Sequence, residues 1–157
     1  MRWDAIGTLG CPVARSLSVI GDRWTILILR DAFLGARRFD DFRASLRCSP
    51  HVLSTRLAKL TRNGVLERRP YQTAPVRHEY RLTEKGRDLY PVIAGLLGWG
   101  ERWMTSSDRR AITLVHRDCG HETTPTLTCS ACGHALDARS VQARVAIDDD
   151  ERRRHAR

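Results

Sequence analysis

The chain has 157 residues, the length of one ordinary domain or of a small domain with an appendage, which excludes a large multidomain enzyme. Lys and Arg number 27 against 18 Asp and Glu, and the formal net charge of +9 favours an anionic partner, either nucleic acid or an anionic membrane surface. Hydrophobic residues make up 41% of the chain, which is enough for a folded core.

The N-terminal sequence and the cysteines predict the compartment. The first ten residues lack the apolar stretch of a secretory signal, and the longest apolar run, 92–100, is too short to cross a bilayer. We therefore expect a soluble, cytoplasmic protein with no membrane partner. The five cysteines, at positions 11, 48, 119, 129 and 132, fit reduced thiols or metal ligands better than a disulfide framework.

Three helices are expected before residue 50. Apolar residues at helical spacing predict a short first helix over 13–20. Asp22 is a good N-cap for a second helix that Gly35 ends, and its largely apolar circumference is typical of the central helix of a small bundle. A third short helix is predicted over 39–46.

Residues 50–62 are predicted to form a fourth helix with two different faces. Ser49 is a good N-cap, Pro50 suits the first helical position, and Asn63-Gly64 is a stop signal. At about 100° per residue, three leucines share one side and are expected to be buried: Leu53, Leu57 and Leu60.

The opposite side of this helix carries small, polar and basic groups. Small side chains let a helix approach base edges, and Lys or Arg can reach phosphates or guanine. The pattern alone also fits an ordinary amphipathic surface helix. The outward residues and those flanking them are His51, Ser54, Thr55, Ala58, Lys59 and Arg62.

A basic hairpin is predicted directly after this helix. Residues 65–69 are rich in strand formers, 70–76 contain two prolines, and 78–82 alternate polar and apolar residues. Nine basic residues against three acidic ones lie in 54–87. A helix-turn-helix followed by a hairpin that carries Arg68, Arg69, Arg77 and Arg81 predicts a winged helix, a mainly α fold with a small β-hairpin wing.

A last helix is predicted from Thr83, with an apolar series that runs to Trp103 and a kink at Pro91. It has more apolar surface than one small domain needs. We expect it to pack on the same helix of a second chain in a homodimer, and burial within one chain is the alternative.

The chain resembles the HxlR-type branch of the MarR-like winged-helix transcriptional regulators of bacteria over residues 8–104. The motifs that carry the resemblance are Cys11-Pro12-Val13, Gly21-Asp22-Arg23-Trp24, Arg38-Phe39-Asp40-Asp41-Phe42, Ser49-Pro50 with Leu53, Arg56-Leu57 and Leu60, Asn63-Gly64, and Tyr80-Arg81-Leu82-Thr83-Glu84-Lys85-Gly86.

The resemblance implies a homodimeric regulator, often a repressor, that binds double-stranded operator DNA and responds to an unknown small-molecule or redox inducer. Residues 49–62 correspond to the recognition helix and residues 67–81 to the wing. The expected DNA contacts are Ser49, His51, Ser54, Thr55, Lys59, Arg62, Arg68, Arg69, Arg77 and Arg81.

Cys11 has two interpretations. Some members of the family sense electrophiles or oxidants through a cysteine at the start of the first helix, and Cys11 has that position. A helix N-terminus favours the reactive thiolate. The alternative is a small residue packed at the dimer interface.

The remaining chain is divided into a linker at 105–110, a small Cys/His appendage at 111–145 and a disordered charged tail at 146–157. The appendage is expected to be β-rich, because 112–115 and 123–128 are β-prone and could form a hairpin. The appendage contains two similar motifs, His116-Arg117-Asp118-Cys119-Gly120-His121 and Cys129-Ser130-Ala131-Cys132-Gly133-His134. Two ligands two residues apart with Gly after the second are typical of a zinc-ribbon knuckle. The predicted ligands of a structural zinc are His116, Cys119, Cys129 and Cys132, with His121 or His134 as substitutes.

Alternatives to zinc are free thiols or redox-active cysteines, and the fold requires no other cofactor. The chain contains nothing like a nucleophile elbow or a glycine-rich phosphate loop, so we expect no enzymatic activity. A zinc-ribbon module that binds nucleic acid or protein without catalysis is the remaining competitor.

Overall fold

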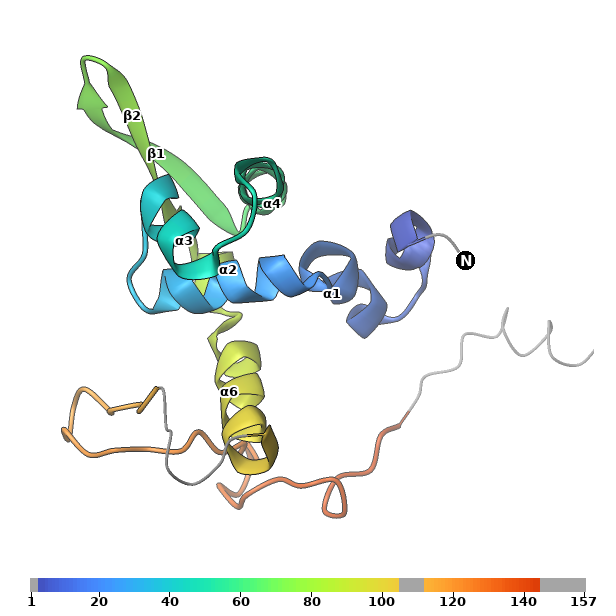
Figure 1. Cartoon of the computed structure of the whole chain (residues 1–157). Coiled ribbons are helices and arrows are strands. Elements are labelled where there is room, and N and C mark those ends of the chain that lie inside the picture. Colours follow the sequence, from blue (N-terminus) through green and yellow to red (C-terminus); the bar gives the residue numbers. More distant parts are fainter. Residues whose placement is uncertain (1–2, 105–111, 145–157) are drawn as a thin grey trace, which may run out of the picture. The chain divides into compact units, whose positions relative to one another are not determined.

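The computed structural model describes residues 3–104 and 112–144. The chain divides into two compact units, Met1–Arg110 and Ala111–Arg157 (Figure 1). The predicted linker at 105–110 and the predicted tail at 146–157 lie outside the described residues.

The first unit is mainly helical with one two-stranded antiparallel hairpin, which confirms the predicted winged-helix class. In chain order its elements are η1 (Trp3–Thr8), α1 (Pro12–Ile20), α2 (Arg23–Phe33), α3 (Phe39–Leu46), α4 (Pro50–Arg62), β1 (Leu66–Thr73), β2 (Val76–Leu82), α5 (Glu84–Arg87) and α6 (Tyr90–Met104).

Local sequence signals explain where these helices begin. Pro12 stands in the first turn of α1, where its missing N–H costs nothing. The Asp22 carboxylate accepts hydrogen bonds from the backbone N–H groups of Trp24 (3.1 Å) and Thr25 (3.2 Å) and so caps α2. Ser49 caps α4 in the same way, through the N–H of Val52 at 3.3 Å.

The core of the first unit lies between α2, α3, α4 and the start of β1. The predicted leucine stripe of α4 is confirmed, because Leu53, Leu57 and Leu60 are all fully buried. They pack in one cluster with apolar residues of the neighbouring elements, namely Ile20, Ile28, Leu29, Phe42, Leu46, Val65, Leu66 and Ile93.

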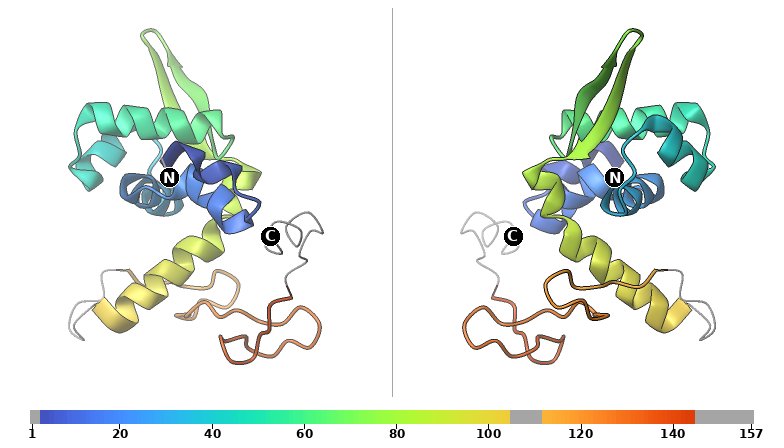
Figure 2. Two further views of the ribbon diagram at one scale, coloured as in Figure 1. Left: turned by 90° about the vertical axis from the view of Figure 1, so that its right-hand side faces the viewer. Right: turned by 90° about the vertical axis from the view of Figure 1, so that its left-hand side faces the viewer.

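The hairpin rises beside α4, on the side of α2 opposite to α6 (Figures 1 and 2). Its register pairs Leu66 with Leu82 at the base and Thr73 with Val76 at the tip, with an irregularity between Pro70 and Gln72. Pro70 has no backbone N–H to donate to the strand ladder, and this missing donor explains the irregular register at this point.

The last helical region differs from the predicted kinked helix. It consists of two helices, α5 and α6, with Pro91 as the second residue of α6. A proline ring clashes with the carbonyl four residues earlier, here that of Arg87, but it is well accommodated in a first helical turn. The chain therefore ends α5 at Arg87 and begins a new helix at Tyr90.

The second unit is described over residues 112–144. In this segment the structure has isolated β-bridges, Val115 with Glu122 and Thr128 with Ala135, in place of continuous strands. Among the described residues of the whole chain, no helix is both long and apolar enough to cross a membrane.

Candidate nucleic-acid interface

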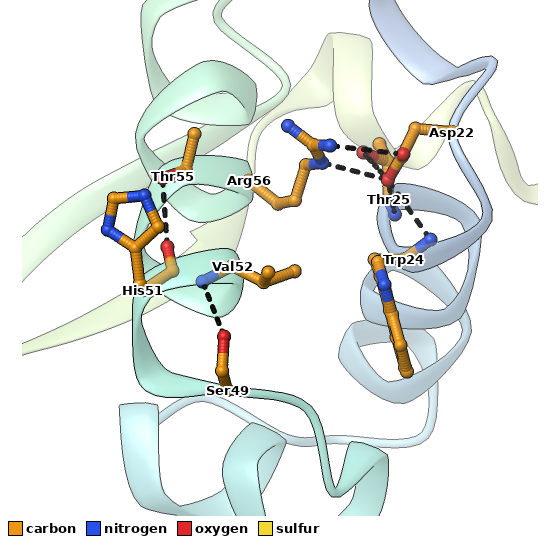
Figure 3. A network of polar contacts seen from close by, with 8 residues as sticks. All are labelled: Asp22, Trp24, Thr25, Ser49, His51, Val52, Thr55 and Arg56. Atoms are coloured by element: carbon orange, nitrogen blue, oxygen red, sulfur yellow. Dashed lines mark hydrogen bonds and ion pairs between the residues drawn. The ribbon is translucent and has the colours of Figure 1, made fainter.

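Helix α4 presents an exposed polar face opposite its buried leucines. His51, Ser54, Thr55 and Arg62 are exposed and Lys59 is half-buried. Figure 3 shows His51 and Thr55 on the side of α4 that faces away from Asp22. The hydroxyl of Thr55 donates to the carbonyl oxygen of His51 at 2.8 Å, so its side chain lies close against the helix.

An ion pair ties α4 to α2. The Arg56 guanidinium donates to both carboxylate oxygens of Asp22, with Nε–Oδ1 2.8 Å and Nη2–Oδ2 3.2 Å (Figure 3). Burial opposes ionisation of Asp22, but the hydrogen bonds from Arg56, Thr25 and Trp24 outweigh it and hold the pKa of this carboxyl below its ordinary value of 3.8. One charged group therefore caps α2 and positions α4.

The turn between α3 and α4 contains a left-handed residue. Arg47, which follows α3, has φ 51° and is exposed. A non-glycine residue in this conformation costs about 1 kcal/mol or more, and it sets the direction in which the chain enters α4.

The basic side chains of the hairpin differ in whether they form an ion pair with an acidic residue. Arg69 pairs with Glu67 at 2.6 Å, and Arg81 pairs with Glu79 at 2.6 Å. Arg77 is exposed, and none of the ion pairs among the described residues involves it. Among these three arginines, Arg77 is therefore accessible, whereas Arg69 and Arg81 are partly neutralised by their acidic partners.

Arg68 also lies on the hairpin and is exposed. Its Nη2 lies 3.0 Å from Nδ1 of His78 on the opposite strand. None of the ion pairs among the described residues involves Arg68, so its charge remains available to an anion in the way that of Arg77 does.

The hairpin is held to the start of α3. The Arg38 guanidinium lies 4.5 Å from the ring centroid of Tyr71, a cation–π geometry. The backbone N–H of Tyr80 donates to the carbonyl oxygen of Arg37 at 2.7 Å, and Arg38 forms a β-bridge with Glu79. These contacts fix the hairpin relative to α3 and α4.

Sequence reasoning did not assign a role to Arg56 or to the Arg38–Tyr71 contact. Arg56 belongs to a sequence motif, but its partner Asp22 is 34 residues away in the chain. Arg38 and Tyr71 are likewise remote in sequence. No periodicity within one element indicates such pairs.

Helix α6 has an exposed apolar stripe. Val92, Leu96, Trp99 and Trp103 are 44%, 49%, 55% and 64% exposed, and at about 100° per residue they span about 60° of the helix circumference. Only Ile93 and Ala94 of the helix are buried. Contiguous exposed apolar surface is typical of sites of association.

The remaining predicted site residues are cysteines and one histidine. Cys11 is a free, exposed thiol directly before α1. In the second unit, His116 lies close to Cys119, with Nδ1–Sγ 3.3 Å. Across residues 3–104 and 112–144, however, no three His, Cys, Asp or Glu side chains come together as a metal-sized group. The four predicted ligands are thus present as pairs.

Known proteins show the same combination of elements. The family model of HxlR-like helix-turn-helix proteins matches residues 19–108. The chain is 44% identical over 132 residues to Rv3095 of Mycobacterium tuberculosis, an uncharacterised HTH-type transcriptional regulator, and the match covers 84% of each chain. It is 38% identical over 101 residues to the HTH-type regulator YdeP of Bacillus subtilis, covering 64% of this chain and 79% of YdeP.

Solved structures agree with this relationship. The crystal structure of PA1607, a candidate transcription factor, matches with a TM-score of 0.79 and 37% identity, over 89% of this chain and 98% of that one. The redox regulator HypR in its reduced form matches with a TM-score of 0.56 and 33% identity, over 59% of this chain and 92% of HypR. The chain belongs to the HxlR-like helix-turn-helix family of transcriptional regulators.

Proposed function

We propose that the chain is a repressor that binds operator DNA as a homodimer in the cytoplasm. Helix α4 enters the major groove, and the hairpin contacts the DNA backbone or the adjacent minor groove. The observation that carries the proposal is the exposed face of α4, where polar and basic side chains lie opposite a fully buried leucine stripe.

The side chains divide by their chemistry. His51, Ser54 and Thr55 reach base edges, because they are short or planar and lie on the exposed face of α4. The basic groups hold phosphates, and Ser49 lies at the end of α4 that points its N–H groups outward. The phosphate contacts in this proposal are Lys59, Arg62, Arg68, Arg69, Arg77 and Arg81.

Dimerisation uses the apolar stripe of α6. A stripe of two tryptophans, a leucine and a valine is costly to leave in water, at roughly 25 cal/mol per Å² of apolar surface. Val13 of α1 is also 65% exposed. Two-fold pairing through such faces presents two copies of α4 to DNA half-sites about one helical turn apart.

Footprinting on the DNA upstream of the chain's own gene tests this proposal. The expected result is two protected tracts related by symmetry, with centres about 10 base pairs apart. A single asymmetric tract, or protection that is independent of sequence, would contradict dimeric operator binding.

A second candidate function, redox sensing, is favoured by Cys11. This thiol is exposed and free, and it stands next to an exposed apolar face of α1 that includes Val13 and Leu17. A peroxide converts such a thiol to a sulfenic acid and is itself reduced to water. The new polar group at this place then alters the pairing of the two chains and with it the DNA affinity.

Peroxide treatment followed by DNA titration tests the sensor. The affinity of the parent chain is expected to change and to return with a thiol reductant, whereas Cys11→Ser keeps the untreated affinity throughout. Cys48→Ser is the matched control, because Cys48 is half-buried and should leave the response intact. A response that persists in Cys11→Ser would rule out Cys11 as the sensor.

A further inference from the structure

Over residues 112–144, the second unit has no buried hydrophobic core. Every side chain described from Val115 to Arg144 is exposed, except that of Cys129, which is half-buried. A segment of this size gains too little from burial to remain folded by that means alone. Its regular turns therefore need another source of stability.

The first of these turns is built around His116 and Cys119. The backbone N–H of Gly120 donates to the carbonyl oxygen of His116 at 2.8 Å, and the N–H of His116 donates to the carbonyl oxygen of His121 at 2.9 Å. Gly120 has φ 70°, a left-handed conformation that glycine adopts without strain. This turn brings the side chains of His116 and Cys119 close to each other.

The second turn repeats the first. The backbone N–H of Gly133 donates to the carbonyl oxygen of Cys129 at 2.8 Å, and the N–H of Cys129 donates to the carbonyl oxygen of His134 at 2.8 Å. Gly133 has φ 74°. In addition, the backbone N–H groups of Ala131 and Cys132 donate to the sulfur of Cys129. The chain therefore turns at 129–134 in the same way as at 116–121.

The spacing of the side-chain atoms fits a shared ion. Nδ1 of His116 and Sγ of Cys119 are 3.3 Å apart. Tetrahedral zinc with Zn–N of about 2.0 Å and Zn–S of about 2.3 Å separates two such ligands by about 3.5 Å. Each turn is thus a half-site with two donors, and the described residues of the chain contain no group of three.

We propose that the two turns close on one Zn²⁺, with His116, Cys119, Cys129 and Cys132 as its four ligands. Structural zinc sites are four-coordinate, and a His-Cys₃ set satisfies the ion without a water molecule. Zinc binding then supplies the folding free energy that a hydrophobic core would otherwise provide, and it holds the second unit in a single fold. The site is structural and is formed by residues of the second unit alone.

Zinc content of the intact reduced chain tests the proposal. The chain, purified without chelator, is expected to carry one zinc per chain by elemental analysis. Cys129→Ser and Cys119→Ser should each lower the zinc content at least severalfold. Cys11→Ser and Cys48→Ser are matched controls, since both thiols lie in the first unit and should keep one zinc per chain.

Cobalt substitution and thiol protection give independent readouts. Co²⁺ in the metal-free chain should give the intense visible spectrum of tetrahedral thiolate coordination. Alkylation should spare Cys119, Cys129 and Cys132 with zinc bound and modify them after chelation, whereas Cys11 reacts in both states.

Several results would overturn the proposal. A reduced chain that contains no zinc and gives only an octahedral Co²⁺ spectrum has no such site. Zinc that remains in Cys129→Ser is bound elsewhere, and zinc lost from His121→Ala but not from His116→Ala means a different ligand set. A disulfide between Cys129 and Cys132 in the chain as purified, without metal, would mean that these cysteines form a covalent bond and do not bind zinc.

Discussion

Asp22 and Arg56 join the start of α2 to the middle of α4 through two hydrogen bonds, Nε–Oδ1 2.8 Å and Nη2–Oδ2 3.2 Å. The same carboxylate caps α2 through the N–H groups of Trp24 and Thr25. The orientation of α4 relative to α2 therefore depends on the residue that caps α2.

A double-mutant cycle measures this coupling. Asp22→Ala should lower the free energy of unfolding by about 1 kcal/mol for the lost cap and about 2 kcal/mol for the lost charged hydrogen bonds. Arg56→Met removes only the ion pair and should cost less. In an Asp22→Asn background, which keeps a capping oxygen, Arg56→Met should cost little in urea unfolding. Equal costs in both backgrounds would mean that the pair is not coupled.

Acid should destabilise the first unit through two carboxylates. The hydrogen bonds around Asp22 keep its pKa low despite burial, and the N–H groups of Arg38 and Arg37 lower the pKa of Asp41. A carboxylate with a depressed folded pKa contributes stability that is fully present above the unfolded value and is lost as the pH falls through the folded value.

The free energy of unfolding should therefore fall as the pH drops below about 4. Asp41→Asn should be less stable than the parent chain at pH 7 and should have a flatter dependence on pH. Denaturant titrations between pH 7 and pH 3 make the comparison. If the variant and the parent chain show the same slope, Asp41 does not carry this effect.

Gly86 should not tolerate a side chain. A Cβ at this position would overlap the carbonyl oxygen of Val65 and lie 3.0 Å from Cδ2 of Leu82. Gly86→Ala should lower stability by about 1–3 kcal/mol. Gly95→Ala is the matched control, because a Cβ there has nothing within 4 Å and alanine favours the helix. Thermal unfolding of the two variants should move in opposite directions.

Basic and polar residues at the DNA-binding face should have different effects on binding. Arg77→Ala should weaken binding to every sequence and reduce the slope of log affinity against log salt by about 1, and Lys59→Ala should act in the same sense. His51→Ala and Thr55→Ala should instead change sequence preference.

Arg69→Ala is the matched control on the hairpin, because Glu67 already engages that guanidinium at 2.6 Å. It should change the salt slope less than Arg77→Ala does. Identical behaviour of Arg77, Lys59, His51 and Thr55 variants would show that the orientation of α4 on DNA is different.

The apolar stripe of α6 should control association. Trp99→Glu places a charge in the middle of the stripe and should convert a dimer to monomers at micromolar concentration in sedimentation velocity. Val76→Glu is the control, since Val76 is 62% exposed at the tip of the hairpin, away from α6. A dimer that survives Trp99→Glu must pair through another surface.

Local patterns predicted the elements, whereas contacts between elements required the structure. The leucine stripe of α4 follows from the helical period, and the caps at Asp22 and Ser49 from residue type. The apolar pattern that continues through Pro91 predicts one kinked helix, but the chain forms two helices that are separated just before Pro91.

The sequence partly predicts the ion pairs of the hairpin arginines. Glu67 and Arg69 are two residues apart in one strand, as are Glu79 and Arg81, so each pair shares a face. The Asp22–Arg56 pair had no such signal, because it depends on how α2 packs against α4.

Titration of the purified chain against DNA from its own upstream region, with a scrambled duplex of the same composition as reference, is the most direct test of operator binding. Across a salt series, we expect tighter binding to the upstream duplex and a steep linear fall of log affinity with log salt. Equal and weak binding to both duplexes by the reduced chain would contradict sequence-specific recognition by α4.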